Sequence, residues 1–337
     1  MGRDTVKLKD IAEATGFSTN TVSLALRESP RIPESTREVI KTAARKLNYT
    51  PNQIAKSLVS RKSMTIGLVV TDILNPTLTR VAQRVTDLLA EMGYSTLFAT
   101  SNNTLTKENE VIAMFRGRQV DGILIYPSEH KNTSHVAALR AAGFPVVSMV
   151  NDPKKTVDTV SVDEAEGARL VTAHLIEMGH TKIAFIDAAS FLGNTEKFEG
   201  YKAALETAGI TYDRDLIVDA KGHGIEAGYA TIKNLWDAGK RPTAVLGTND
   251  SLALGVQKFA DDTGLRVPDD LAIAGFDNIE FARMSSVPIT TVAYPVERVA
   301  SDAVKHLVAL IDAEGPLPKP TETLFKPDLL VRQSTGG

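Results

Sequence analysis

The hydrophobic pattern of the chain changes its period at Met64, and this change constrains the fold more than any other feature. From Met64 onward, short continuous apolar runs alternate with stretches of helical sequence. The runs are Met64–Val70, Tyr94–Phe98, Gly122–Tyr126, Pro145–Met149, Lys182–Ile186, Thr243–Gly247 and Leu271–Gly275. Strands that are apolar throughout are covered on both faces, so we predict an α/β core of two doubly wound parallel sheets. Such two-lobed cores bind small ligands between their lobes, at the carboxyl ends of strands.

The residues before Met64 follow a helical period instead. The apolar faces of two short helices are formed by Leu8, Ile11, Ala12 and Thr15, and by Val22, Ala25 and Leu26. Gly16 allows the positive φ of a sharp turn between them, and Ser18 suits the N-cap of the second helix. A third helix is predicted over 32–47, with Pro33 near its start. The pattern predicts an all-α helix-turn-helix head whose second helix offers short side chains to base edges in a major groove.

Charge is divided unevenly along the chain. Residues 1–62 hold twelve Lys/Arg and six Asp/Glu, a net of +6, whereas the remainder holds twenty-six against thirty-five, a net of −9. A basic head attracts phosphate through counterion release, and an acidic body does not favour wrapping by DNA. The alternative is a solvated, lysine-rich surface domain. Together with the helix-turn-helix pattern, the charge split predicts a head that binds double-stranded DNA.

A short helix is predicted after the third one. It begins with Thr50 as a cap and Pro51 at the first helical position, and it extends to Leu58. A helix of about two turns is marginal in water. We expect it to be disordered without DNA and to fold when two copies meet in a minor groove, where Leu58 would wedge between base steps. The alternative is an ordinary linker with one chance leucine.

Composition excludes several classes of function. The 337 residues include no cysteine, which excludes disulfides, thiolate metal sites and cysteine catalysis. The histidines follow no zinc-hydrolase spacing, and no glycine-rich phosphate loop or nucleophile–base pair is recognisable, so we expect no cofactor, no metal and no enzymatic activity. No apolar run approaches a membrane span and the first residues open no signal peptide, so we expect a cytoplasmic protein. The rival classes are an enzyme and a transport or chemosensory binding protein with the same two-lobed core.

Motifs along essentially the whole chain occur in the order of one known family. They are Leu8–Glu13, Ser18–Ser23, Tyr49–Asn52, Ala55–Leu58, Ile66–Val70, Val120–Ile123, His174–His180, Arg241–Ala244, Gly275–Asn278 and Thr290–Val292. In these the chain resembles the lactose-repressor/galactose-repressor (LacI/GalR) family of bacterial transcription regulators. The resemblance implies a periplasmic-binding-protein-like core, a small effector such as a sugar or sugar acid, pseudo-palindromic operator DNA, repression, and a homodimer or tetramer. The tail Arg332–Gly337 lacks a leucine-heptad extension, which favours the dimer.

The resemblance also assigns candidate DNA contacts. They are Ser18, Thr19, Asn20, Thr21 and Leu24 in the reading helix, and Asn52, Ala55, Lys56 and Leu58 in the hinge. Leu24 departs from the family, which more often carries a hydrogen-bonding side chain there. Leucine packs on a thymine methyl but donates nothing to guanine, so Asn20, which can pair bidentately with adenine, is the expected specificity determinant. The alternative is that Leu24 packs inward and contacts no base.

Candidate effector residues lie at loops that face the predicted cleft. Asp277, Asn249 and Asp152 follow strands, where carboxylate and amide groups could bind vicinal hydroxyls, although each residue alone is also typical of a turn or cap. The resemblance adds Leu74, Asn75, Thr77, Phe191, Lys197 and His223. The family has arginine at the position of Lys197. Lysine delivers a point charge and lacks the planar, two-pronged guanidinium group of arginine. It therefore either binds an acidic or phosphorylated ligand less strictly or faces solvent; we favour the first.

These expectations give a three-part chain. Residues 1–49 form the helix-turn-helix domain, 50–63 the hinge helix and linker, and 64–337 the effector-binding and dimerisation core. Within the core, we expect an N-lobe of 64–162 plus 292–322 and a C-lobe of 163–291 plus 323–337. A last helix near Val296–Ile311 and a closing strand near Leu324 would cross back between the lobes.

Overall fold

The computed structural model describes residues 6–50, 62–187 and 195–337. The chain separates into two compact units, Met1–Ser63 and Met64–Gly337. The first unit is the head and the second is the core. Within the ranges that the structure describes, no helix is long and apolar enough to cross a membrane.

The head contains α1 (Leu8–Thr15), α2 (Thr19–Leu26) and α3 (Glu34–Lys46). Gly16 ends α1 with a φ of 73° and donates its N–H to the carbonyl of Ala12, which confirms the sharp turn. The three helices share one small core of Ile11, Ala12, Val22, Ala25, Ile40 and Ala44. The predicted helix-turn-helix arrangement is therefore the one that the structure adopts.

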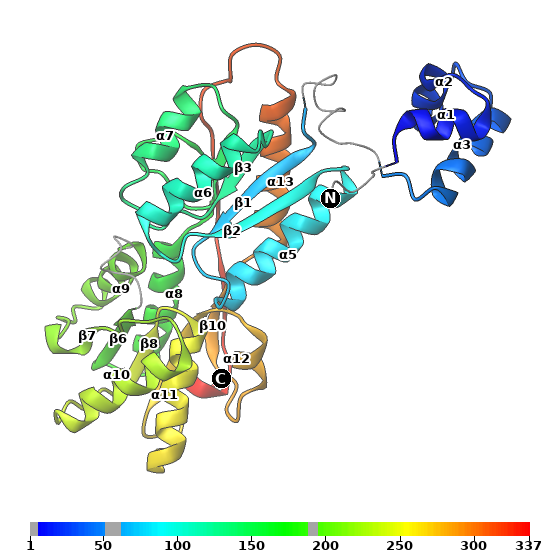
Figure 1. Ribbon diagram of the computed structural model, residues 1–337. Helices are drawn as coiled ribbons and strands as arrows, with labels where there is room; N and C mark the ends of the chain where they lie inside the picture. Colours follow the sequence, from blue (N-terminus) through cyan, green and yellow to red (C-terminus); the bar gives the residue numbers. More distant parts are fainter. Residues whose placement is uncertain (1–5, 51–61, 188–194) are drawn as a thin grey trace. The chain divides into compact units, whose positions relative to one another are not determined.

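The core consists of two α/β lobes, each built on one sheet (Figure 1). The N-lobe contains β1 (Thr65–Val70), α5 (Pro76–Glu91), β2 (Ser95–Thr100), α6 (Leu105–Gly117), β3 (Gly122–Ile125), α7 (Ser134–Ala141), β4 (Val146–Ser148), β5 (Asp158–Val162), α13 (Val296–Asp312) and β11 (Glu322–Phe325). The C-lobe contains α8 (Glu164–Glu177), β6 (Ile183–Asp187), α9 (Glu196–Thr207), β7 (Ile217–Asp219), α10 (Ile225–Asp237), β8 (Ala244–Gly247), α11 (Asp250–Thr263), β9 (Ala272–Asp277), α12 (Glu280–Met284), β10 (Thr290–Ala293) and β12 (Asp328–Leu330).

Both sheets are doubly wound, as the sequence predicts, and the structure gives their strand order. The N-lobe order is β11-β5-β4-β3-β1-β2, and the C-lobe order is β12-β10-β9-β8-β6-β7. Strand pairs in both sheets are parallel, with β12 as an antiparallel edge strand on β10. The carboxyl ends of parallel strands lie at one edge of a sheet, which is where doubly wound folds hold ligands.

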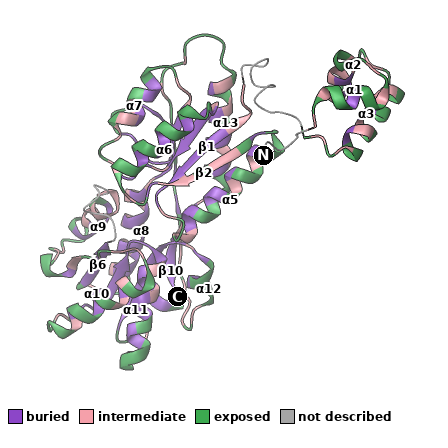
Figure 2. Ribbon diagram, viewed as in Figure 1, coloured by how far each residue is buried: buried purple, intermediate pink, exposed green. Residues whose placement is uncertain are grey.

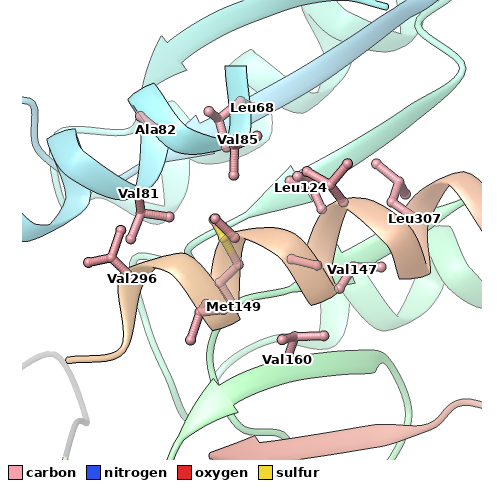
Figure 3. Close-up of a cluster of buried hydrophobic side chains, with 14 of the residues drawn as sticks. Leu68, Val81, Ala82, Val85, Leu124, Val147, Met149, Val160, Val296 and Leu307 are labelled. Carbon is pink, nitrogen blue, oxygen red and sulfur yellow. The ribbon is translucent and has the colours of Figure 1, made fainter. Parts of the chain in front are cut away.

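Helices cover both faces of each sheet, so the inner strands are buried, whereas the edge strands β2, β7, β11 and β12 are partly exposed (Figure 2). In the N-lobe, side chains of α5 and α13 meet over the sheet, including Val81, Val85 and Leu307 (Figure 3). Helices α6 and α7 cover the opposite face through Phe115 and Val136. Burial of these apolar residues on two faces explains why the strands appear in the sequence as unbroken apolar runs.

The crossings between the lobes differ from the expected boundaries. Strand β11 pairs in parallel with β5, so the N-lobe keeps the chain to Phe325, beyond the expected limit at 322. Strand β10 pairs with β9 in the C-lobe, although 292 was expected to begin the N-lobe. Both boundaries shift because the lobe to which a strand belongs depends on the distant strand with which it pairs. The local hydrophobic pattern does not identify that partner. The sequence pattern also missed β5, β7 and β10, which are short or rich in threonine.

Candidate functional site

The reading helix of the head begins with a side-chain cap. The Oγ of Ser18 accepts a hydrogen bond from the backbone N–H of Thr21 at 3.1 Å. The hydroxyls of Ser18 and Thr21 lie 2.9 Å apart. Thr19 and Asn20 follow in the first turn of α2 and are exposed. The cap fixes the start of the helix and leaves these two polar side chains facing solvent, as a major-groove reader requires.

Leu24 lies one turn further along α2 and is half-buried. It is absent from the apolar cluster of the head and from the described residues that pack against that cluster, whereas Leu26 packs there. This placement favours the outward orientation of Leu24 over the inward alternative. The other DNA-contact candidates, Asn52, Ala55, Lys56 and Leu58, lie outside the described residues.

The core holds a pocket at the carboxyl ends of strands from both lobes. Its space measures about 780 Å³, including the part that is open to solvent. Six of the predicted effector residues line it: Asn75, Thr77, Lys197, His223, Asn249 and Asp277. Most of its lining side chains carry oxygen or nitrogen atoms.

Asp277 ends β9 and is buried at 8% exposure in a strained backbone conformation, with φ at 111°. Such a φ is rare for a residue with a side chain and is typical of functional sites. Burial, with the neighbouring carboxyl of Glu164, raises the pKa of Asp277 to about 6, against the opposing effect of Lys197. The carboxyl of Asp277 is therefore available to a ligand and close to its titration range at neutral pH.

A second buried carboxyl supports Asp277 from behind. Asp250 is fully buried; its Oδ1 accepts from the Thr291 hydroxyl at 2.6 Å and its Oδ2 from the backbone N–H of Ile279 at 2.8 Å. A Cβ on Gly275 would lie 2.2 Å from Asp250 Oδ1, so glycine is required there. These contacts hold the end of β9 and the loop after it in place.

Lys197 projects into the pocket from the first turn of α9. Its Nζ donates to the carbonyl of Thr248 at 3.0 Å and lies 3.5 Å from Glu164 Oε1. It also lies 4.1 Å from the centre of the Phe276 ring. Burial alone would lower the pKa of Lys197, but Glu164, Asp277 and Asp187 together raise it, so the side chain stays cationic. The ammonium group of Lys197 therefore already has partners within the protein. This placement argues against the solvent-facing alternative, and it weakens the expectation that Lys197 binds an acidic ligand.

Two further strand ends contribute to the C-lobe side of the pocket. The Oδ1 of Asp187, at the end of β6, accepts from the Thr248 hydroxyl at 3.1 Å. Asn249 caps α11, with its side-chain oxygen accepting from the N–H of Leu252 at 2.8 Å. Burial lowers the pKa of His223, which keeps this imidazole neutral at neutral pH. Besides the ammonium of Lys197, the C-lobe thus presents hydrogen-bond acceptors and a neutral imidazole ring.

The N-lobe wall is formed by the loop after β1 and the loop after β3. Asn75 caps α5 by accepting from the N–H of Thr77 at 2.9 Å. In the second loop, Ser128 donates its N–H to Glu108 at 2.5 Å and its hydroxyl to Ser101 at 2.7 Å. Because Glu108 is fully buried, these contacts anchor the loop that carries the pocket residues after β3.

Two predicted effector residues do not reach the pocket. Leu74 is 84% exposed and is not among the lining residues, because Asn75 turns the chain into α5 just after it. Asp152 is buried in its own turn, where its carboxyl accepts from Lys154, Thr156 and Val157. These contacts saturate Asp152 and correct the prediction that it binds the effector. Phe191 lies outside the described residues.

Other lining residues were not predicted. They are Thr71, Leu78, Asn103, Tyr126, Pro127, Ser128, His130, Glu164, Asp187, Thr248 and Tyr294. Tyr126 and Asp187 stand at strand ends, so the rule used for Asp277 would have found them. Glu164 follows β5, a strand that the pattern did not reveal, and Tyr294 follows β10 for the same reason.

Two side-chain atoms around the pocket are buried without a partner among the described residues. They are the Nδ1 of His130 and the hydroxyl of Tyr294. Buried polar atoms are normally hydrogen-bonded, and leaving one unsatisfied costs about 1–3 kcal/mol. These atoms mark places where a bound ligand or water completes the hydrogen bonding. Within the described ranges, no group of three or more His, Cys, Asp or Glu side chains is placed to hold a metal ion.

Family models match both parts of the chain. A model of bacterial regulatory proteins of the lacI family matches residues 7–52, and a model of a periplasmic binding protein-like domain matches residues 172–335. The HTH-type transcriptional regulator DegA of Bacillus subtilis is 31% identical over 97% of each chain. The HTH-type transcriptional repressor PurR of Vibrio atlanticus is 34% identical over 90% of this chain and 91% of its own.

Solved structures share the fold. A transcriptional regulator CelR–cellobiose complex matches with a TM-score of 0.72 and 28% identity, covering 98% of this chain and 99% of that one. The Lac repressor dimer bound to operator and the anti-inducer ONPF matches with a TM-score of 0.86 over the same shares, at 24% identity. The second likeness supports the fold and nothing beyond it.

Proposed function

This chain belongs to the lacI family of bacterial regulatory proteins, and from that premise we propose how its own residues perform the family's task. It is a sequence-specific DNA-binding transcriptional regulator, a repressor, whose affinity for operator DNA is controlled by a small ligand bound in the core.

We infer that Asn20 and Thr19 contact base edges, with Leu24 against a thymine methyl. The exposed first turn of α2 supports this assignment, because it is the part of a recognition helix that enters a major groove. The basic balance of the head supplies phosphate contacts. DNA binding in turn supports a cytoplasmic location.

For the effector we propose a small polyhydroxy metabolite, a carbohydrate or a derivative of one. The observation that carries this assignment is the ring of hydrogen-bonding side chains around the pocket, which includes Asp277, Asn249 and Thr77. Vicinal hydroxyls both donate and accept, so they match such a mixed set. Tyr126 and His130, whose rings lie 5.7 Å apart edge to face, offer an apolar surface to a sugar ring.

Ligand binding is coupled to DNA binding through the angle between the lobes. Two hydrogen bonds join the lobes beside the pocket, from Arg80 to the carbonyl of Asn278 at 3.3 Å and from Asn151 to Glu196 at 3.5 Å. A ligand that contacts both lobes stabilises one angle between them. It can shift the affinity for DNA only by the difference between its own affinities for the two lobe arrangements. A coupling free energy of about 1–3 kcal/mol changes operator occupancy by several-fold to a hundredfold.

A homodimer is the proposed assembly. Large apolar side chains are exposed on the loop before α5 and on α12, namely Ile73, Leu74, Phe281 and Met284. The hydrogen bond between Arg80 of α5 and Asn278 shows that α5 adjoins the segment leading into α12. Exposed apolar patches of this kind mark protein interfaces, and two copies would present two heads to a pseudo-palindromic operator.

A selection experiment tests the proposal as a whole. The full chain is incubated with a pool of random duplexes, and bound DNA is sequenced at two salt concentrations. We expect enrichment of one pseudo-palindromic motif, binding that weakens steeply with salt, and a change in affinity when a neutral sugar occupies the core. Binding without any sequence preference would refute the DNA-reading assignment, and an affinity unchanged by every ligand that stabilises the core would refute the coupling.

A further inference from the structure

The effector pocket continues into a smaller recess at the carboxyl ends of β3, β4 and β5. The recess shares Tyr126, His130, Glu164 and Tyr294 with the pocket, and the polar residues that it adds are Asn151, Ser161 and Glu196. None of these three polar residues was a predicted effector residue. The recess therefore extends the ligand site toward the start of α9.

Close packing of two helices forms one wall of this recess. Helix α8 begins at Glu164 and helix α9 begins at Glu196. A Cβ on Gly200 of α9 would lie 1.9 Å from the carbonyl oxygen of Ala165 in α8, so only glycine allows the two helices to approach this closely. The first turns of both helices, and their acidic side chains, are thereby held side by side.

The formal charge of the combined site is negative. Four carboxyls line it, those of Glu164, Asp187, Glu196 and Asp277, whereas Lys197 is its only ammonium among the described lining residues. Residues 188–194, which the structure does not describe, contain no ionisable side chain. The cation of Lys197 is already engaged by Glu164 and Thr248.

Burial and the neighbouring negative charge both act on Glu196. Burial, followed by the charge of Glu164, raises the pKa of Glu196 to about 7. Among the described residues, the charged and polar groups that act on Glu196 include Glu164, Asp163, Lys197 and Asn151. Burial also lowers the pKa of His130, so this imidazole adds no positive charge at neutral pH. The carboxyls therefore repel one another unless a proton or another cation lies between them.

The recess also holds buried polar atoms that lack a partner. The hydroxyl of Ser161 (2% exposed), the hydroxyl of Tyr294 (7% exposed) and the Oδ1 of Asn151 have none among the described residues. Each oxygen can accept a hydrogen bond, and together with the carboxyls they form a cluster of acceptors. An ammonium group, which has three donors and no acceptor, complements such a cluster.

We propose that the effector carries a protonated amine and that this amine binds in the recess between Glu164 and Glu196, with Ser161 and Asn151 completing its hydrogen bonds. The assignment rests on the proposed effector function of the pocket and narrows its ligand to an aminated, polyhydroxy compound. A carboxylate or phosphate at the same place would face the carboxyls and is excluded by their repulsion.

Matched ligands test the proposal on the full-length protein. Each set contains a neutral sugar, its amino sugar and its uronic acid, namely glucose, glucosamine and glucuronate, and galactose, galactosamine and galacturonate. Thermal shift and titration calorimetry compare the members of a set. We expect the amino sugar of at least one set to bind about tenfold or more tightly than its neutral partner, as expected for a buried charge pair, and the uronic acids not to bind.

Two variants assign the effect to the recess. Glu196→Gln should remove the preference for the amine, whereas Glu199→Gln should retain it, because Glu199 lies on the same helix but is exposed and pairs with Lys202 at 2.7 Å. Tighter binding of the neutral or acidic member, no amine-dependent shift at millimolar concentrations, or an amine preference that survives in Glu196→Gln would each overturn the proposal.

A DNA measurement on the same samples separates this proposal from the proposed function. Should only neutral sugars bind and still alter operator affinity, the amine assignment fails while the regulator function stands. Should no preparation bind DNA selectively, the function itself fails.

Discussion

At the scale of single residues, the buried carboxyl of Asp250 links the pocket to the stability of the core. Burial, followed by the charge of Asp277, raises the pKa of Asp250 to about 8, while Thr291, Ile279 and Arg332 oppose the shift. The folded core therefore keeps a proton on Asp250 that the unfolded chain releases at neutral pH. A group with this shift favours folding at low pH and loses that effect as pH rises toward its folded pKa.

The pH dependence of stability follows directly. We expect the free energy of unfolding of wild type, measured relative to Asp250→Asn, to fall between about pH 4 and pH 8, by up to about 1.4 kcal/mol per pH unit. Asparagine resembles the protonated acid and does not titrate. Chemical denaturation at several pH values measures the difference. For Asp277→Asn, the same difference should level off above about pH 6, because the pKa of Asp277 is lower; coincident profiles would contradict this assignment.

Asn20 provides the residue-scale test of DNA recognition. Because an amide pairs bidentately with adenine, Asn20→Ala should weaken binding to the selected operator by about 1–3 kcal/mol and relax the preference at one base position. Fluorescence anisotropy at fixed salt measures both effects. Lys9→Ala on α1 is the control, since it removes a charge and should weaken binding to all sequences alike. A uniform loss with Asn20→Ala would show that Asn20 does not read a base.

At the scale of elements, the contact between α8 and α9 controls the geometry of the pocket. Gly200 places α9 against α8, and α9 in turn carries Lys197 and Glu196 toward the site. Polar contacts between the first turns of α9 and α8, such as the ion pair of Lys197 with Glu164, depend on this distance. The spacing of two helices therefore sets the position of several binding groups at once.

A methyl group at position 200 tests this dependence. Gly200→Ala should lower the free energy of unfolding of the core by about 1–3 kcal/mol and weaken effector binding, because the methyl group forces the helices apart. Gly117→Ala is the matched control; Gly117 ends helix α6 and a Cβ there meets nothing within 4 Å. It should be neutral or slightly stabilising. Equal effects of the two substitutions, measured by denaturation and calorimetry, would rule out the close-packing argument.

At the scale of the whole molecule, assembly depends on apolar surface that the monomer leaves uncovered. Met284 of α12 is 70% exposed and Phe281 is 68% exposed. Leu74, which the sequence suggested as a wall of the pocket, is exposed on the N-lobe instead. In the proposed dimer these side chains are buried, and the apolar area removed from water stabilises the pair.

A charge placed on this surface should break the dimer. We expect Met284→Asp to raise the dimer dissociation constant by about tenfold or more, and to weaken operator binding because single heads then contact single half-sites. Met178→Asp is the control, since Met178 is 49% exposed at the end of α8, on a surface assigned no interface. Sedimentation equilibrium measures the assembly. A fully dimeric Met284→Asp protein would exclude this surface as the interface.

Local sequence determined much of this protein, because local physics is sufficient for it. Periodicity distinguishes the helices of the head from the buried strands of the core, and Gly16 and Ser18 define the turn and cap of the reading helix. The rule that ligands bind where parallel strands end identified Asp277 and Asn249 as pocket residues. Each of these inferences uses residues within a few positions of one another.

Only the tertiary structure decided which loops meet. Asp152 also follows a strand, yet its own turn satisfies its carboxyl, whereas Glu164, Glu196 and Tyr294 reach one recess from three separate parts of the chain. Their meeting depends on strand order, on the crossings between the lobes and on the approach of α9 to α8. These are long-range contacts, and no local pattern of hydrophobicity or charge records them, because the residues concerned are neighbours in space alone.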